Sequence, residues 1–151
     1  METQTEHNEK CPHCGANMKI WKHNLSMGLV KTFRQFGLAV KTKGKNDIDL
    51  QEEIELTKNQ YNNFQKLRYF GLVHHVKDQD GNRKAGRWLI TRNGWAFLRG
   101  DVQMPEYVKT FRNEIWERAE VGKFVFEFDP FYTKEYFQKE FDFDIFQQRL
   151  I

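Results

Sequence analysis

Apolar residues recur every three or four positions in the segment LSMGLVKTFRQFGLAV at 25–40, which predicts an amphipathic helix. The apolar face of this helix consists of Leu25, Leu29, Val30, Phe33, Phe36 and Val40. The polar stretch KTKGKND then ends the pattern, and IDL at 48–50 is long enough for one short strand. The next stretch, QEEIEL at 51–56, is compatible with a short helix.

A second, longer helix is expected to begin near Lys58. Thr57 and Gln60 have the spacing of a capping box, in which the hydroxyl accepts one backbone N–H and the amide reaches back to another. Gly71 follows Phe70 and suits the left-handed position that ends a helix. The pattern therefore predicts a helix that ends at about Phe70.

After Gly71 the pattern of apolar residues changes from helical to extended and predicts a β-hairpin. An extended run is followed by the turn signal Asp80-Gly81-Asn82 and by a second extended run, Arg87–Thr91. His74 and His75 fall in the first run, where neighbouring side chains point to opposite faces. The segment TRNGWAFLRG then predicts a short helix that Gly100 stops.

This order of helix, short strand, short helix, capped helix and basic hairpin resembles the winged helix-turn-helix superfamily of DNA-binding domains over residues 25–100. The stretch GRWLITRNGWAFL is similar to the ending that many such domains show. The resemblance implies an α+β fold with a β-hairpin wing, and small phage and archaeal regulators are similar in pairing such a domain with two cysteines. It divides the chain into a leader (1–24), a winged-helix domain (25–100) and an acidic, aromatic C-terminal extension (101–151).

The predicted helix after Thr57 has two different faces at 100° per residue. One face packs, and its members are Thr57, Gln60, Tyr61, Phe64, Leu67 and Arg68. The opposite face carries no acid, and its side chains can bond base edges and phosphates. Its members, with Asn63 at the border, are Lys58, Asn59, Asn62, Asn63, Lys66 and Tyr69. In the hairpin, Arg83, Lys84 and Arg87 are placed to contact a flanking phosphate backbone. The alternatives are a protein-binding face, a plain exposed helix surface and a solubilising turn.

Charge is distributed unevenly along the chain. Residues 11–50 carry seven bases and two acids, and residues 51–100 carry nine bases and five acids. Residues 101–151 carry seven bases and eleven acids. A basic body suits a polyanion partner because neutralised phosphates release counterions, although a solvated surface would have the same composition.

Cys11 and Cys14 form half of a zinc knuckle, CPHCG. The chain has two cysteines, so the remaining ligands have to be histidines, with His23 the first candidate and His7 the second, or the cysteines of a second chain. Ordinary reduced thiols are the alternative. CPHC also looks like the active-site tetrapeptide of oxidising thioredoxin-fold enzymes, but the ten polar residues before it and the body after it do not fit that fold.

The C-terminal extension is rich in Phe and Tyr. KFVFEFDP at 123–130 alternates like a strand, with Phe124, Phe126 and Phe128 on one side, and PEYVKTFRNEIW at 105–116 reads as an extended link. Three roles for the extension are open: completing the core, forming a homodimer surface, or docking a foreign protein.

No enzyme motif is present: there is no phosphate loop, nucleophile elbow or HExxH sequence. The N-terminus lacks a signal-peptide pattern and no apolar run is long enough to span a membrane, so we expect a cytoplasmic protein. The leading hypothesis is a duplex DNA-binding protein, either sequence-specific or general, that acts in transcription regulation. Zinc is a candidate cofactor. The second is a protein-binding winged helix, for example one from a phage or mobile element that engages or inhibits a host complex.

Overall fold

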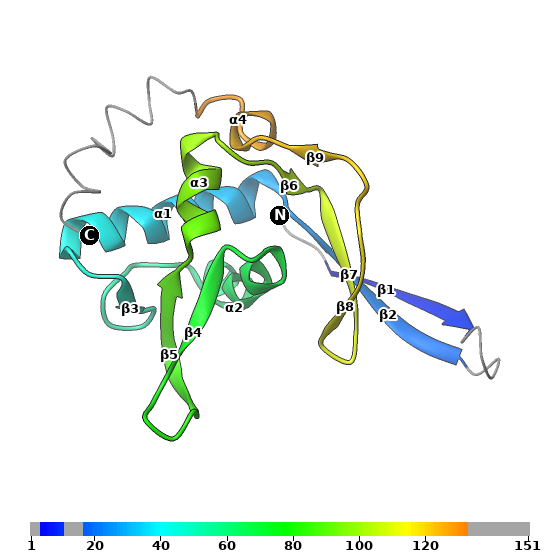
Figure 1. Cartoon of the computed structure of the whole chain (residues 1–151), viewed down its shortest axis with the longest axis horizontal. Helices are drawn as coiled ribbons and strands as arrows, with labels where there is room; N and C mark the ends of the chain where they lie inside the picture. The colour runs from blue at the N-terminus through cyan, green and yellow to red at the C-terminus, as the bar shows by residue number, and fades with distance from the viewer. Residues whose placement is uncertain (1–3, 11–16, 133–151) are drawn as a thin grey trace.

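The longest helix, α1 (Met27–Lys43), is the centre of the fold in the computed structural model, which describes residues 4–10 and 17–132 (Figure 1). It begins where the Ser26 hydroxyl accepts the Leu29 N–H at 3.2 Å and ends at Gly44, whose φ of 67° is left-handed. The predicted apolar face is buried, and Phe33 and Phe36 are fully enclosed. The expected helix is therefore confirmed. It ends at Lys43, three residues beyond the end of the apolar pattern at Val40.

Below α1 lies a three-stranded antiparallel sheet in the order β3-β5-β4. It consists of β3 (Asp47–Asp49), β4 (Val73–Lys77) and β5 (Arg83–Ile90), and the last two form the expected hairpin. Helix α3 (Arg92–Arg99) follows directly, with the Thr91 hydroxyl accepting the Gly94 N–H at 2.9 Å. These elements, together with α1, form the body of the protein.

The segment 51–56, for which a short helix was considered, forms a turn instead. The Asp49 carboxylate accepts the backbone N–H groups of Gln51 and Glu52 at 2.9 and 3.3 Å, and Glu53 N–H donates to the Asp49 carbonyl at 2.9 Å. An aspartate that bonds the backbone just after it competes with helix propagation, so one turn forms and stops.

The capped helix is split into α2 (Lys58–Phe64) and a 3₁₀ segment, η1 (Gln65–Phe70). The capping box at Thr57 is present, with Gln60 N–H donating to the hydroxyl at 3.1 Å and Thr57 N–H donating to the Gln60 amide oxygen at 2.9 Å. Gly71 ends the unit with a φ of 73°. The start and end predicted from the sequence are both confirmed.

The leader and the extension meet in a second sheet, which we call the outer sheet. It is antiparallel in the order β1-β2-β7-β8 and consists of β1 (Gln4–Lys10), β2 (Asn17–Asn24), β7 (Tyr107–Phe111) and β8 (Glu114–Arg118). The segment 105–116 is thus a hairpin, and the expectation of an extended link was wrong. Arg112 and Asn113 form its tight turn with φ of 50° and 65°, values that Asn tolerates better than Arg.

The strand expected at 123–130 is also wrong. After the small sheet of β6 (Met104–Pro105) and β9 (Gly122–Lys123), residues Val125–Phe128 form the short helix α4. The Glu127 carboxylate accepts the Phe124 N–H at 2.7 Å and thereby closes the first turn. Val125 is fully buried whereas Phe124, a member of the face predicted for the strand, is 37% exposed, so the buried position is not one that the strand pattern assigned to that face.

The described part of the extension completes the core of the body. Val108, Val125 and Tyr132 are each fully buried within the same apolar cluster as Phe33 and Phe36. Arg34 on α1 forms an ion pair with the buried Asp129 at 3.1 Å and lies over the Tyr132 ring at 4.3 Å. Of the three roles considered for the extension, residues up to Tyr132 therefore perform the first.

Candidate nucleic-acid interface

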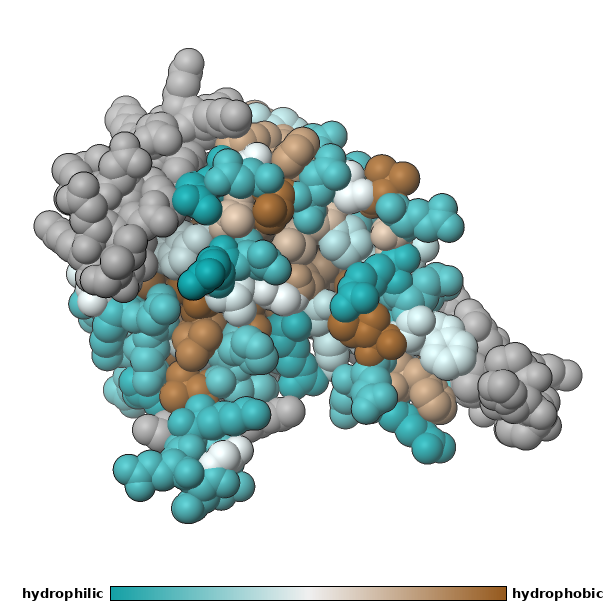
Figure 2. Space-filling model, viewed as in Figure 1, coloured by the Kyte–Doolittle hydropathy of each residue, from teal (hydrophilic) through white to brown (hydrophobic). Residues whose placement is uncertain are grey.

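Helix α2 stands between two projecting hairpins (Figure 1). The wing, β4–β5, lies on one side and the β7–β8 hairpin lies on the other, and both tips point away from α1. In the space-filling view the two hairpins are separated by a notch (Figure 2). The surface between them is therefore concave and is the natural place for a large ligand.

The N-terminal half of α2 presents the expected polar face. Lys58, Asn59 and Asn62 are exposed, and Phe64 on the opposite side is fully buried. Asn63 is half-buried, and its amide donates to the Asn59 carbonyl at 2.9 Å and to the Asn59 side-chain oxygen at 3.1 Å. Three outward side chains thus remain, and one of them, Asn59, is held in place by its neighbour.

Lys66 does not belong to the exposed face, which corrects the prediction. Its side chain is 5% exposed. The prediction assumed 100° per residue throughout, whereas η1 advances by about 120° per residue and so turns Lys66 by roughly 40° toward the packing side. The periodicity of the sequence does not indicate where an α-helix tightens.

Tyr69, the last residue assigned to that face, contacts the outer sheet. Its ring stacks on His23 of β2 with 4.7 Å between centroids. Its hydroxyl accepts from Arg68 Nη2 at 2.7 Å and donates to the Asn113 side-chain oxygen at 3.4 Å. Tyr69 therefore fixes the outer sheet against η1.

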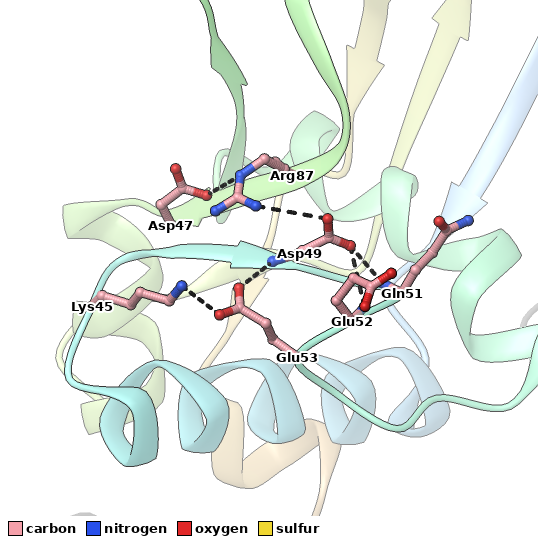
Figure 3. A network of polar contacts seen from close by, with 7 residues as sticks. All are labelled: Lys45, Asp47, Asp49, Gln51, Glu52, Glu53 and Arg87. Carbon is pink, nitrogen blue, oxygen red and sulfur yellow. Dashed lines mark hydrogen bonds and ion pairs between the residues drawn. The ribbon is translucent and has the colours of Figure 1, made fainter.

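Arg87 is not a free wing cation. Its Nε donates to Asp47 at 2.9 Å, and its Nη1 lies 3.7 Å from Asp49 (Figure 3). β5 pairs with β3, so Arg87 is opposite Asp49 in the register, and its charge is neutralised within the sheet. Arg83 and Lys84 lie in β5 closer to the tip, but their side chains are outside what the structure describes.

The acidic neighbours of Arg87 are themselves part of a network. Glu53 accepts the Asp49 N–H at 2.8 Å and pairs with Lys45, and this contact with Lys45 is the main reason why the pKa of Glu53 is lowered (Figure 3). The network ties β3, the 50–53 turn and the base of the wing together. It thereby stabilises the body.

The wing turn is built by Asp78. Its carboxylate accepts the backbone N–H groups of Asp80 and Asn82, each at 2.9 Å, and Gly81 adopts a φ of 83°.

The two histidines of β4 have different surroundings, as their strand position predicts. His74 is exposed, whereas His75 stacks on Trp88 with 3.8 Å between centroids.

His23 is buried within the outer sheet, where β2 pairs with β7. It is 3% exposed, and its Nε2 is 2.9 Å from the Thr110 hydroxyl of β7. Lys10 pairs with Asn17 at the end of the β1–β2 hairpin that leads into residues 11–16. His23 is six residues farther along β2 than Asn17, roughly 20 Å at 3.3 Å per residue.

His23 is therefore held within the outer sheet, and its role as a zinc ligand stays a prediction. Burial, followed by the charges of Lys66 and Arg68, lowers the pKa of His23 to about 4. Cys11 and Cys14 lie outside the described residues. Within the described ranges, no group of three or more His, Cys, Asp or Glu side chains is placed to hold a metal ion. Zinc binding stays a prediction that measuring the zinc content of the intact protein would test.

Sequence reasoning missed one part of this surface, the groove between the two hairpins. It has a volume of about 340 Å³ and is lined by Arg68, Tyr69, Val73, His74, His75, Lys77, Asn113 and Ile115. Arg68 was assigned to the packing face, and Asn113 was assigned to a link. The groove exists because β7–β8 is a hairpin that reaches back to η1, a contact between residues more than forty positions apart.

Comparisons with known proteins add no relatives. No protein-family model matches the chain, and no curated protein or solved structure is significantly similar to it. Among the helices in the described part of the chain, none combines the length and the apolar character needed to cross a membrane.

Proposed function

We propose that this protein is a small cytoplasmic duplex DNA-binding protein with a regulatory role, which inserts α2 into the major groove and places the β4–β5 wing along the backbone. The observation that carries the proposal is the exposed, acid-free face of Lys58, Asn59 and Asn62 on α2, the helix that stands between the two hairpins (Figure 1). Asn can bond the paired edge groups of adenine, and Lys can reach guanine or a phosphate.

The order of elements in the body supports this assignment. The body contains a helix, a strand, a capped helix and a hairpin in this order along the chain, and its three strands form one sheet in the order β3-β5-β4, which supports the proposal of a winged helix. The short helix expected at 51–56 is a turn, so the helix-turn-helix pair is formed by α1 and α2 across a longer connection. The basic composition of residues 11–100 is suited to phosphate contacts.

Replacing Lys58 and Asn62 by Ala tests the proposal. Both residues are exposed, so the double variant should keep its melting temperature while its affinity for duplex DNA falls about tenfold or more. Fluorescence polarisation on random-sequence duplex at two salt concentrations measures this.

The matched control replaces Lys43 and Asn93, which are exposed on α1 and α3, by Ala. The control should bind like the unchanged protein. Absence of duplex binding by the unchanged protein at low salt would refute the proposed function.

A second candidate function, docking of a foreign protein, is favoured by the outer sheet. β8 is an edge strand with all five residues exposed, and it carries Ile115 and Trp116 at 40% and 44% exposure. Apolar side chains on an open edge are typical of protein contacts. A protein of this kind would show no salt-dependent affinity for DNA.

A further inference from the structure

Arg68 is a half-buried cation that is held in place by neutral groups. Its Nη2 donates to the Tyr69 hydroxyl at 2.7 Å, and its Nη1 is 3.4 Å from His75 Nε2, which must accept because Arg has no acceptor. The guanidinium carbon lies 4.7 Å from the centroid of the Tyr69 ring. No carboxylate in the described part of the chain pairs with Arg68, in contrast to Arg87 and Arg34.

Among the described residues that line the groove around Arg68, none is an acid. Its polar lining consists of Arg68, Tyr69, His74, His75, Lys77 and Asn113, contributed by η1, by the wing strand β4 and by the β7–β8 turn. Lys66 adds a further positive charge close by, since it and Arg68 both lower the pKa of His23. A partly desolvated cation without a counterion is costly, and an anion in the groove would remove that cost.

The geometry suits one kind of anion. A guanidinium held by two fixed partners is preorganised, and its fork matches the oxygens of a phosphate group. The groove opens between the two hairpins that flank α2, where a DNA backbone would pass if α2 entered the major groove (Figures 1 and 2). Arg112 at the tip of β7–β8 is exposed and adds another cation on this side.

We propose that the groove between the hairpins binds a phosphodiester group of the DNA backbone, with Arg68 as the central donor and with Lys77 and Asn113 at its two walls. This inference rests on the proposed function and extends it, because it makes the β7–β8 hairpin a second arm that grips the backbone opposite the wing. The phosphate is bound without regard to sequence, so this arm contributes affinity and not specificity.

The test measures duplex affinity as a function of salt for Arg68→Gln. Loss of one phosphate contact should lower affinity about tenfold and reduce the slope of log K against log salt by about one. The control, Arg92→Gln, removes the same charge from an exposed position on α3 outside the groove and should leave the slope unchanged.

Two further variants keep the test decisive if Arg68→Gln impairs folding. Lys77→Gln changes an exposed side chain, and Asn113→Gly removes the amide at a position whose φ of 65° glycine adopts without strain. Each should lower affinity severalfold, and Lys77→Gln should also reduce the slope by about one. If neither Lys77→Gln nor Asn113→Gly changes the affinity, and the unchanged protein still binds duplex, the groove inference is overturned while the proposed function stands.

A competition experiment separates a backbone phosphate from free phosphate. Inorganic phosphate should displace duplex no better than chloride at equal ionic strength, because a single small anion lacks the contacts to α2 and the wing. Displacement at low millimolar phosphate, in excess of the chloride control, would overturn the assignment to the DNA backbone. Failure of the unchanged protein to bind any duplex would instead overturn the proposed function, and with it the inferred ligand.

Discussion

The body and the outer sheet are stabilised in different ways. In the body, large side chains from α1, the three-stranded sheet and the packed side of α2 and η1 enclose one another. The ring of Phe64 in α2 lies 4.9 Å from that of Phe36 and 5.4 Å from that of Trp88. In the outer sheet, β8 is exposed along its whole length, and the contact with the body depends on a few residues such as His23 and Tyr69. Substitutions in the body should therefore act on stability, and those in the outer sheet mainly on binding.

The largest effect is expected at Phe64. Replacing this fully buried ring by Ala removes contacts with Phe36 and Trp88 and leaves a cavity, which should cost about 3–5 kcal/mol in the free energy of unfolding. Urea denaturation measures the loss. The same truncation at Phe131, which is 81% exposed, is the control and should change stability by less than about 0.5 kcal/mol. Equal losses at both positions would contradict the core described above.

An intermediate effect is expected at the junction of the two regions. The pKa of His23 is lowered to about 4 from an ordinary value of 6.5, so as the pH falls below 6.5 the unfolded chain takes up a proton that the folded chain does not. His23 therefore contributes stability that is fully present above pH 6.5 and is lost as the pH falls toward 4. The loss between about pH 7 and about pH 4.5 should be roughly 2–3 kcal/mol, at about 1.4 kcal/mol per unit of pKa.

A comparison with His23→Gln isolates this contribution, because carboxylates also titrate in the same range. Thr110 can still bond the amide of glutamine, while the ionisable group is gone. The variant should show a shallower decline of unfolding free energy over the same interval. Parallel declines in both proteins would mean that His23 is hydrated or protonated in the folded state.

The smallest effect is expected on β8. Trp116 is 44% exposed and contacts Phe111 edge to face at 6.1 Å, so Trp116→Ser should cost less than about 1 kcal/mol. Urea denaturation at two protein concentrations is the measurement. A loss above about 2 kcal/mol that depends on concentration would show that a second copy of the chain covers this strand, and would sharpen the homodimer alternative.

The sequence predicted the body well because its signals are local. The apolar period of α1, the capping box at Thr57, the turn at Asp80-Gly81-Asn82 and the glycine stop after Phe70 each act within a few residues, and each is found in the structure. The position of the exposed residues Lys58, Asn59 and Asn62 follows from the same helical period.

Most of the predictions that were wrong concern contacts between residues far apart in the sequence. The pairing of β2 with β7 has no local sequence signal, so the segment 105–116 was predicted to be an extended link between two parts of the chain. The sequence predicted Arg87 to be a cation of the wing that contacts phosphate. Its partners Asp47 and Asp49 lie about forty residues earlier and become its neighbours only through the sheet register. The prediction that Lys66 is exposed was wrong for a local reason, because the helix changes from α to 3₁₀ geometry at Gln65. The groove at Arg68 depends on the contact of the β7–β8 hairpin with η1, which is also a long-range feature, and was therefore not foreseen.

The pairing of β2 with β7 also has a consequence for the order in which the chain folds. Asn24 meets Tyr107, and Leu25 N–H donates to the Glu106 carbonyl at 2.8 Å, so this contact closes a loop of about eighty residues. Closing such a loop in an unstructured chain costs roughly 4 kcal/mol of entropy from its length alone. Once α1 and the three-stranded sheet have formed, the two ends are already close and most of that cost disappears. Since β2 is synthesised about eighty residues before its partner β7, we expect the outer sheet to be the last part to assemble.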